Sequence, residues 1–426
     1  MTDIGAYGDF SANLHAGMAR QQIPANVMIE ISRRCPLNCS HCYNNLPMGD
    51  VEAKSGELTY AEHCRILDEL AEAGCLWICF TGGEIFARMD FLDIYTYAKK
   101  KGFIVTLFTN GTLITPKIAD YLAEWRPFSI EITLYGRTKE TYERLTRVPG
   151  SYERCLRGIQ LLKERGLSLA LKTVAVTVNK HEIWEMKRFV QEDLGLPFKF
   201  DPMINARIDC SLSPLAVRLS PPEIVEMDLE DPGRVAEWKT FSSRFIGPSH
   251  APGKEDELYH CGGGISSFAL DPAGRMSICV LSHFDTYDLR HGTLDEGWNH
   301  FLARVREKKV NRVTKCNACH LKSVCGMCPA NGELESGDPE SPVDFLCHTA
   351  HLRAEVFGWN VQPHGECEYC EGGSGYSTVQ VEASLVRERK PVAKPGGFLP
   401  SLASGPGTLP SAGSGCTTGC GSCGGH

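Results

Sequence analysis

The sequence lacks the features that would direct a chain into a membrane or onto a nucleic acid. No apolar run is long enough to span a bilayer. The N-terminus, Met1-Thr2-Asp3-Ile4-Gly5-Ala6, lacks the basic-then-apolar pattern of a signal peptide. Cations are not in excess, because 44 Lys and Arg stand against 52 Asp and Glu, a net charge of −8. We therefore expect a cytoplasmic protein with no membrane and no nucleic-acid partner.

Cysteine, in contrast, is abundant. The chain has 426 residues, enough for two or three domains, and 20 of them are cysteines. Grouped cysteines in a chain without an export signal favour metal binding over disulfides. Five cysteines stand apart from the groups. Cys210 has no role that the sequence indicates, and four lie in apolar segments as expected core residues: Cys64, Cys75, Cys79 and Cys155.

The first cysteine group follows an apolar, β-branched run, 26–32, that predicts a buried strand. Cys35, Cys39 and Cys42 have the spacing C-x3-C-x2-C, and Pro36 favours a loop over a helix. Thiolate-only sites favour iron–sulfur clusters or zinc. Because three thiols are one short of a four-ligand site, one metal position is left for a ligand from outside the protein.

This motif, with His41 at its aromatic position, resembles the signature of radical S-adenosylmethionine (radical SAM) enzymes. The resemblance implies a [4Fe–4S] cluster on Cys35, Cys39 and Cys42. Its fourth iron would chelate the amino and carboxylate groups of S-adenosylmethionine. The alternative is a structural zinc knuckle with His41 or a distant residue as the fourth ligand.

Strands and helices alternate after this loop. Further strands are expected at 76–80, 103–108, 128–134, 169–176 and 198–204. Helices are expected from a capping box at Thr59 and Glu62, and around 90–101, 116–124, 152–165 and 181–192. This alternation predicts an α/β fold with a parallel sheet and right-handed crossovers. The family resemblance implies a partial (β/α)6 barrel with the cluster at the carboxyl ends of the strands.

Polar residues at these strand ends are candidate cofactor contacts. Thr81-Gly82-Gly83-Glu84 resembles the family's Gly-Gly-Glu motif, which implies that Gly82, Gly83 and Glu84 hold the methionine amine. Arg144 or Arg147 is a candidate for the methionine carboxylate, although either is as well explained as a solvated helix charge. The resemblance gives this set of cofactor-binding residues: His41, Gly82, Gly83, Glu84, Asn110, Thr133 and Arg147.

Cysteines return at high density after residue 259. A predicted hairpin over 268–278 would bring Cys261 near Cys279. The order Cys261, Gly274-x4-Cys279, Cys316-x2-Cys319-x5-Cys325-x2-Cys328, Cys347 resembles the SPASM domain of radical SAM enzymes that modify peptides, except that two residues rather than three separate Cys325 from Cys328. The resemblance implies two auxiliary [4Fe–4S] clusters, one on Cys261, Cys279 and Cys328 and the other on Cys316, Cys319, Cys325 and Cys347. A pair of zinc ribbons is the alternative.

The chain therefore divides into an N-terminal arm (1–22), a radical SAM partial barrel (23–221), a connector (222–258), a cysteine-rich auxiliary-cluster domain (259–360) and a flexible tail (361–426). The tail holds a C-x2-C pair, Cys367 and Cys370, of unassigned role. Residues 371–426 are rich in Gly, Ser and Pro, so we expect them to be largely disordered. Three more cysteines lie at the end of the chain: Cys416, Cys420 and Cys423.

The resemblance implies reductive cleavage of S-adenosylmethionine to a 5′-deoxyadenosyl radical, which takes a hydrogen atom from the substrate. The expected substrate is a ribosomally made peptide or a protein side chain, and a tetrapyrrole is the alternative. Expected partners are a low-potential electron donor of the flavodoxin or ferredoxin type and a separate peptide-recognition protein. An iron–sulfur electron carrier without catalysis is the alternative of another class, and Thr81-Gly82-Gly83-Glu84 argues against it. No catalytic acid or base is assigned.

Overall fold

A computed structural model describes residues 7–245 and 256–389 of the chain. Its main sheet has the strand order β11-β10-β9-β1-β4-β5-β6-β7-β8, and the neighbours from β1 to β8 pair in parallel. These six strands are β1 (Asn26–Ser32), β4 (Trp77–Gly82), β5 (Ile104–Thr109), β6 (Ser129–Thr133), β7 (Leu169–Val174) and β8 (Phe198–Asp201). The expected α/β fold with a parallel-dominated sheet is confirmed.

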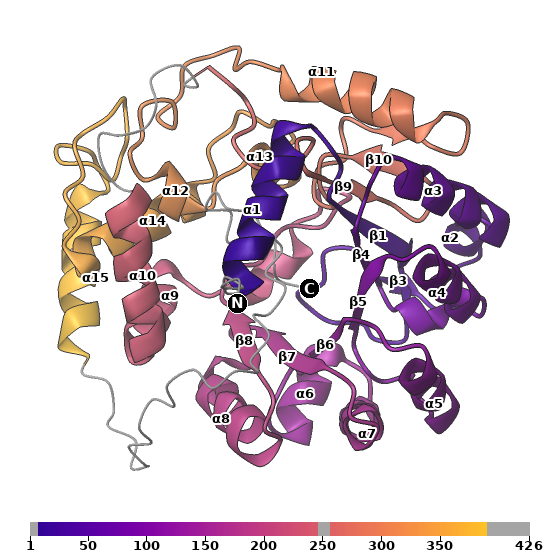
Figure 1. The fold of residues 1–426 in the computed structure, drawn as a ribbon. Helices are drawn as coiled ribbons and strands as arrows, with labels where there is room; N and C mark the ends of the chain where they lie inside the picture. The colour runs from indigo at the N-terminus through magenta and orange to yellow at the C-terminus, as the bar shows by residue number, and fades with distance from the viewer. Residues whose placement is uncertain (1–6, 246–255, 390–426) are drawn as a thin grey trace, which may run out of the picture.

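Helices cover the outer face of this curved sheet (Figure 1). They are α2 (Val51–Gly56), α3 (Tyr60–Glu72), α4 (Phe91–Lys100), α5 (Pro116–Glu124), α6 (Lys139–Thr146), α7 (Ser151–Glu164) and α8 (Ile183–Arg188). The expected capping box is present, because Thr59 and Glu62 bond each other's backbone N–H groups at the start of α3. Strands buried on both faces explain why their sequences read as apolar runs.

The cysteine-rich region continues the same sheet. Strand β9 (Ser267–Leu270) pairs in parallel with β1 and antiparallel with β10 (Arg275–Ser277), and β10 pairs with β11 (Tyr287–Asp288). The predicted hairpin over 268–278 is therefore present. Its pairing with β1 places the auxiliary region directly beside the strand that leads into the first cysteine loop. A separate two-stranded sheet joins β2 (Arg34–Cys35) to β3 (Leu46–Pro47).

A second group of helices lies beside the barrel (Figure 1). It comprises α9 (Pro221–Glu230), α10 (Pro232–Phe245), α12 (Lys322–Cys325), α14 (Asp344–Phe357) and α15 (Tyr376–Glu388), with α11 (Ala303–Arg306) and α13 (Pro329–Ser336) elsewhere in the cysteine-rich region. The buried carboxylate of Asp228 on α9 accepts hydrogen bonds from Arg234 at 2.7 Å and from Arg353 of α14 at 2.9 Å. The connector helices therefore share contacts with the cysteine-rich region.

The expectation of a disordered chain from residue 371 was wrong for residues 376–388. Helix α15 buries Val379, Ala383 and Val386 against Val225 of α9 and Leu352 of α14. These three side chains recur at helical spacing, so they form one apolar stripe. The stripe is short and flanked by Gly and Ser, which concealed it in the composition. Residues 390–426, including Cys416, Cys420 and Cys423, lie outside the described residues.

The N-terminal arm contains one helix, α1 (Tyr7–Arg20). The imidazole of His15 stacks on the indole of Trp77 in β4, with 4.5 Å between the ring centroids. Among the described residues, no helix is both long and apolar enough to cross a membrane.

Candidate metal centre and cofactor pocket

The first cysteine loop is held at the carboxyl end of β1 by the last turn of α6. The backbone N–H groups of Asn38 and Ser40 donate to the carbonyl oxygens of Thr146 and Leu145, each at 3.0 Å. The N–H of Cys42 closes a turn on the Cys39 carbonyl at 3.2 Å. Because α6 supplies carbonyl acceptors at its open end, the loop is fixed by backbone bonds.

A buried carboxylate anchors the far side of the loop. Glu30 of β1 accepts hydrogen bonds from the Tyr43 hydroxyl at 3.0 Å and from the Asn44 side-chain amide at 2.5 Å. The guanidinium of Arg33 lies 3.2 Å from the other carboxylate oxygen. The loop is therefore held between Cys35 and Cys42 by its bonds to α6, and just after Cys42 by its bonds to Glu30.

The three thiols of the loop lie close enough to influence one another's ionisation. Burial raises the pKa of Cys35, Cys39 and Cys42, and the charge of Cys42 raises the pKa of the other two further. Thiolates therefore cost free energy here unless a cation lies among them. A buried three-thiolate set of this kind fits an iron–sulfur cluster or another soft metal centre.

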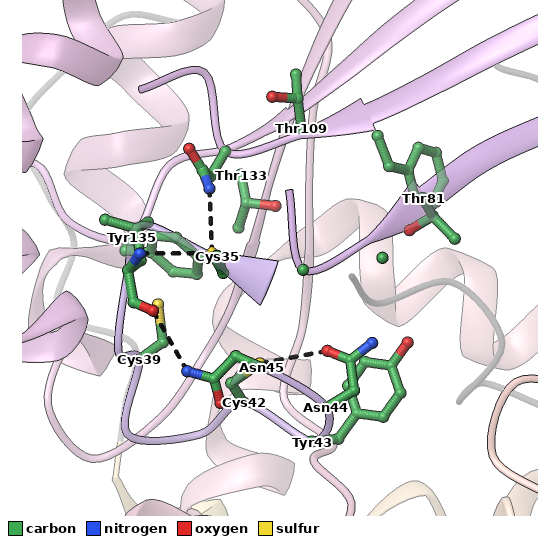
Figure 2. A pocket seen from close by; sticks show the side chains of 15 residues that line it. Cys35, Cys39, Cys42, Tyr43, Asn44, Asn45, Thr81, Thr109, Thr133 and Tyr135 are labelled. Carbon is green, nitrogen blue, oxygen red and sulfur yellow. Dashed lines mark hydrogen bonds between the residues drawn. The ribbon is translucent and has the colours of Figure 1, made fainter. Parts of the chain in front are cut away.

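The loop faces a pocket formed by the ends of β4, β5 and β6 (Figure 2). Figure 2 shows Tyr135 beside Cys35 and Cys39, with Thr109 and Thr133 above Cys35, Thr81 to its right and Cys42 below it. Uncharged residues complete the wall, three of them large and apolar or aromatic and the rest glycines or asparagines: Leu37, Tyr43, Phe108, Gly82, Gly83, Asn44, Asn45 and Asn110. No aspartate, glutamate, lysine, arginine or histidine is among these 15 lining residues.

The two glycines after β4 are required by packing against the strand next to them. A β-carbon on Gly82 would lie 2.2 Å from the Ser32 carbonyl oxygen, and one on Gly83 would lie 2.4 Å from that of Arg33. Gly82 also has a φ of +130°, which side chains disfavour. The glycines therefore let β4 press against the start of the cysteine loop, a reason that sequence reasoning missed.

Glu84 does not line the pocket. Its carboxylate is buried and accepts hydrogen bonds from the Thr109 hydroxyl at 2.7 Å and from the Asn110 backbone N–H at 2.9 Å. Burial raises the pKa of Glu84 to about 7. In this structure Glu84 joins the ends of β4 and β5, and its expected contact with the methionine amine stays a prediction.

Asn110 connects the hydrogen bonds of Glu84, between β4 and β5, to the first cysteine of the loop. Its side-chain oxygen accepts bonds from the N–H and the hydroxyl of Thr112, at 2.9 and 2.6 Å. The amide nitrogen is thereby turned toward Cys35 and donates to its sulfur at 3.5 Å. A hydrogen bond to a ligand sulfur is one of the factors that set the potential of an iron–sulfur cluster.

The other expected cofactor contacts divide into two groups. Thr133 lines the pocket, whereas His41 is buried behind Tyr135, with ring centroids 5.3 Å apart. Burial lowers the pKa of His41 to about 4, so its imidazole is neutral at pH 7. Arg147 is exposed at the end of α6, in a left-handed conformation with φ of 56°, and does not line the pocket.

Arg144, the other carboxylate candidate, donates to the carbonyl oxygen of Val178 at 2.9 Å and does not line the pocket. Tyr135 and Tyr43 do line it, and the sequence analysis named neither. The only signal for Tyr135 was its place two residues after Thr133, at the end of a predicted strand.

The first auxiliary set lies next to the cysteine loop. Cys279 and Cys328 join a small apolar cluster that includes Tyr43 of the loop, with Leu281 and Ala330. The chain after Cys261 runs beside the chain before Cys279, because a β-carbon on Gly263 would lie 2.6 Å from the Ile278 carbonyl oxygen. The structure thus brings Cys279 and Cys328 next to Tyr43, which lines the pocket, and their role as ligands of one cluster stays a prediction.

The second auxiliary set lies where α12 packs on α14. Cys319 and Cys325 contact a cluster with Leu321, Val324 and Ala350. Burial, followed by the charges of Cys319 and Cys316, raises the pKa of Cys325 to about 12. Cys347, on α14, lies 3.9 Å from the sulfur of Cys367. The sequence analysis did not place Cys367 and Cys370 here, and it missed His351 and His364, which lie beside them.

Comparison with known proteins identifies the first part of the chain. Residues 29–190 match the family model of the Radical SAM superfamily. The sequence is 25% identical to AdoMet-dependent heme synthase of Methanosarcina barkeri over 75% of this chain and 95% of that protein. It is 30% identical to PqqA peptide cyclase of Bradyrhizobium diazoefficiens, over 38% of this chain and 42% of that protein.

Solved structures share the fold over most of the chain. Streptococcus suis SuiB bound to S-adenosylmethionine superposes with a TM-score of 0.58 at 17% identity, covering 82% of each chain. SuiB bound to its precursor peptide SuiA gives the same TM-score at 16% identity, covering 81% of this chain and 82% of that one. The partial barrel and the cysteine-rich extension are therefore parts of one known architecture.

Proposed function

Because this chain is a radical SAM enzyme, with residues 29–190 as its Radical SAM domain, we propose that it modifies a ribosomally made peptide or a protein side chain. The fold binds a [4Fe–4S] cluster and S-adenosylmethionine, and its relatives are enzymes, which sets aside the alternative of a non-catalytic electron carrier.

In this proposal Cys35, Cys39 and Cys42 hold the cluster. When bound and reduced, the cluster supplies the electron that cleaves S-adenosylmethionine to methionine and a 5′-deoxyadenosyl radical. The chain's own residues position the cofactor and exclude water. Gly82, Gly83, Asn110 and Thr133 provide uncharged contacts around it, and Tyr135 closes the wall beside Cys39.

The choice of a peptide is supported by the architecture shared with SuiB bound to its precursor peptide, and the absence of charge on the pocket wall agrees with it. None of the 15 lining residues is a lysine, arginine or histidine. Two cations near this wall are not part of it. The Lys172 amine lies 3.1 Å from the ring centroid of Phe108 and 3.3 Å from the Glu131 carboxylate. Arg207 donates to the Cys42 carbonyl at 3.2 Å and to the Asn45 side chain at 2.9 Å. Both cations already have partners, so a substrate with several carboxylates gains no new ion pair from the lining residues, which favours an uncharged peptide segment.

A tetrapyrrole is the second candidate, because the heme synthase relative matches along 75% of this chain. The SuiB structure with its precursor peptide supports the peptide candidate through the shared architecture. The position of Cys279 and Cys328 beside Tyr43 supports a further role for the first auxiliary cluster, as an acceptor for the substrate's electron.

Two partners belong to the same proposal. A low-potential donor of the flavodoxin or ferredoxin type would reduce the clusters. A separate recognition protein would deliver the peptide, since the described part of the N-terminal arm is the single helix α1.

The test compares two substrates with the same reduced, reconstituted protein. One is a synthetic short Gly- or Cys-rich peptide, chosen from reading frames found beside the gene, and the other is an iron coproporphyrin. We expect 5′-deoxyadenosine to form in step with a peptide that has lost two hydrogen atoms, as determined by mass spectrometry. Conversion of the porphyrin, with the peptide left unchanged, would overturn the proposed substrate class.

A further inference from the structure

Four side chains of metal-ligand type converge where the chain returns to helix α14. His351 lies on α14, and His364, Cys367 and Cys370 lie on the segment that follows it. All four are buried, and their ligand atoms lie within 4.8 Å of one another. Only Cys367 and Cys370 are linked by a recognisable spacing, and neither belongs to the two auxiliary sets.

The spacing of these ligand atoms fits a single metal ion. The sulfurs of Cys367 and Cys370 each lie 3.5 Å from Nε2 of His351. In a tetrahedral zinc site, with Zn–S of about 2.3 Å and Zn–N of about 2.0–2.1 Å, sulfur and nitrogen are about 3.6 Å apart. Ligands on two different irons of a cluster stand further apart, because the separation of the two metals is added.

The orientation of His351 also suits a metal ligand. Its Nδ1 lies 2.8 Å from the backbone carbonyl oxygen of Cys347, to which an N–H at that position donates. The proton is thereby fixed on Nδ1, and Nε2 presents its lone pair to the two cysteines. Zinc-bound histidines are held in this way by a carbonyl or carboxylate on the other ring nitrogen.

In His364, too, one ring nitrogen lies beside a backbone carbonyl oxygen and the other does not. Its Nδ1 lies 3.1 Å from the Gln362 carbonyl oxygen and 3.4 Å from the Cys370 sulfur. Its Nε2 is buried and makes no hydrogen bond of good geometry among the described residues, although the ring also interacts with the sulfurs of Cys319 and Cys367. A buried polar atom left in this way costs free energy, and a metal ion removes that cost.

Cys347 lies at the edge of this group. Its sulfur is 3.7 Å from Nδ1 of His351, the nitrogen held by the Cys347 carbonyl, whereas Cys367 and Cys370 contact Nε2. Cys347 thus lies beside Nδ1 rather than Nε2, although its sulfur is also 3.9 Å from the sulfur of Cys367. This leaves it for the second auxiliary set, with Cys316, Cys319 and Cys325.

We propose that His351, His364, Cys367 and Cys370 bind one zinc ion, in addition to the iron–sulfur clusters. Four protein ligands close the coordination sphere, which makes the site structural rather than catalytic. The ion fastens the segment that carries His364, Cys367 and Cys370 to α14, beside Cys347. It thereby holds the chain that leads into α15 over the second auxiliary set.

The test is the metal content of the full chain, purified anaerobically with zinc present and reconstituted with iron and sulfide, together with X-ray absorption at the zinc edge. We expect about one zinc per chain, with two sulfur and two nitrogen neighbours. Cys370→Ser should lose the zinc and keep its iron. Cys64→Ser, on α3, is the matched control and should keep both metals.

His364→Cys keeps four metal ligands, so it still tests the zinc proposal if Cys370→Ser does not fold. It should retain zinc, with the sulfur neighbours rising to three. Wild-type protein without zinc would overturn the proposal. So would a Cys370→Ser variant that keeps its zinc, or one that loses about four irons, since these residues would then be cluster ligands. None of these readings depends on the cleavage of S-adenosylmethionine.

Discussion

At the scale of single residues, the pocket is organised by two polar side chains whose partners are fixed. Asn110 reaches the sulfur of Cys35 because Thr112 holds the other end of its amide. Glu84 joins the ends of β4 and β5 through Thr109 and Asn110. Sequence reasoning named Asn110 and Glu84 but expected both to meet the cofactor. It could not assign the partners, because they depend on which strands become neighbours.

Asn110→Leu should shift the potential of the radical SAM cluster to more negative values. The amide donates to the sulfur of Cys35, and such a bond favours the reduced, more negative cluster. The measurement is a redox titration, monitored by the electron paramagnetic resonance signal of the reduced cluster proposed on Cys35, Cys39 and Cys42. Thr112→Val, which only loosens the Asn110 amide, should give a smaller shift in the same direction. An unchanged potential in Asn110→Leu would show that this contact has no effect on the cluster.

Glu84 should make the protein without cofactor less stable as pH rises from 5 to 7.5. Burial raises the folded-state pKa of this carboxyl from 4.5 to about 7, so the folded state binds the proton more tightly than the unfolded state does. Stability is therefore highest below pH 4.5 as far as this group is concerned, and it falls as pH rises toward 7, by up to roughly 3 kcal/mol.

Thermal unfolding of wild type and Glu84→Gln over this pH range measures the effect of Glu84. Because Asp201 and Glu333 are also buried acids with raised pKa values, only the difference between the two proteins is informative. The unfolding temperature should fall less steeply with rising pH in Glu84→Gln than in wild type. Parallel curves for the two proteins would contradict the raised pKa.

At the scale of elements, the strands could be predicted because their apolar runs are continuous and each is followed by a helical pattern. Helix α15 could not, since its stripe of Val379, Ala383 and Val386 is surrounded by Gly and Ser. The partners of Cys367 and Cys370 also escaped prediction. His351 comes from α14 and His364 from the following segment, so no spacing rule joins the four.

Truncation of the chain distinguishes a packed α15 from a dispensable tail. A chain that ends after Arg389 should unfold at the temperature of the full chain, because it keeps α15. A chain that ends after Gly373 exposes Val225 and Leu352 and loses three buried side chains. Each loss costs about 1–3 kcal/mol, so we expect the unfolding temperature to fall by several degrees. Equal stability of the two truncated chains would contradict the packing of α15.

At the scale of the whole molecule, three cysteine sites follow one another from the barrel outward. The loop with Cys42 contacts the first auxiliary set through Tyr43, and the second auxiliary set lies where α12 packs on α14, with the proposed zinc site beside it. The sheet joins the parts, because β9 of the cysteine-rich region pairs with β1, which leads into the loop.

The proposed radical chemistry depends on one assignment, that Cys35, Cys39 and Cys42 hold the cluster that cleaves S-adenosylmethionine. The most direct measurement is 5′-deoxyadenosine formation by the reduced protein, with iron content determined on the same sample. Wild type should hold roughly twelve irons. The Cys35→Ala/Cys39→Ala/Cys42→Ala variant should form no 5′-deoxyadenosine, lose about four irons and keep the rest. Turnover at the wild-type rate in this variant would contradict the assignment.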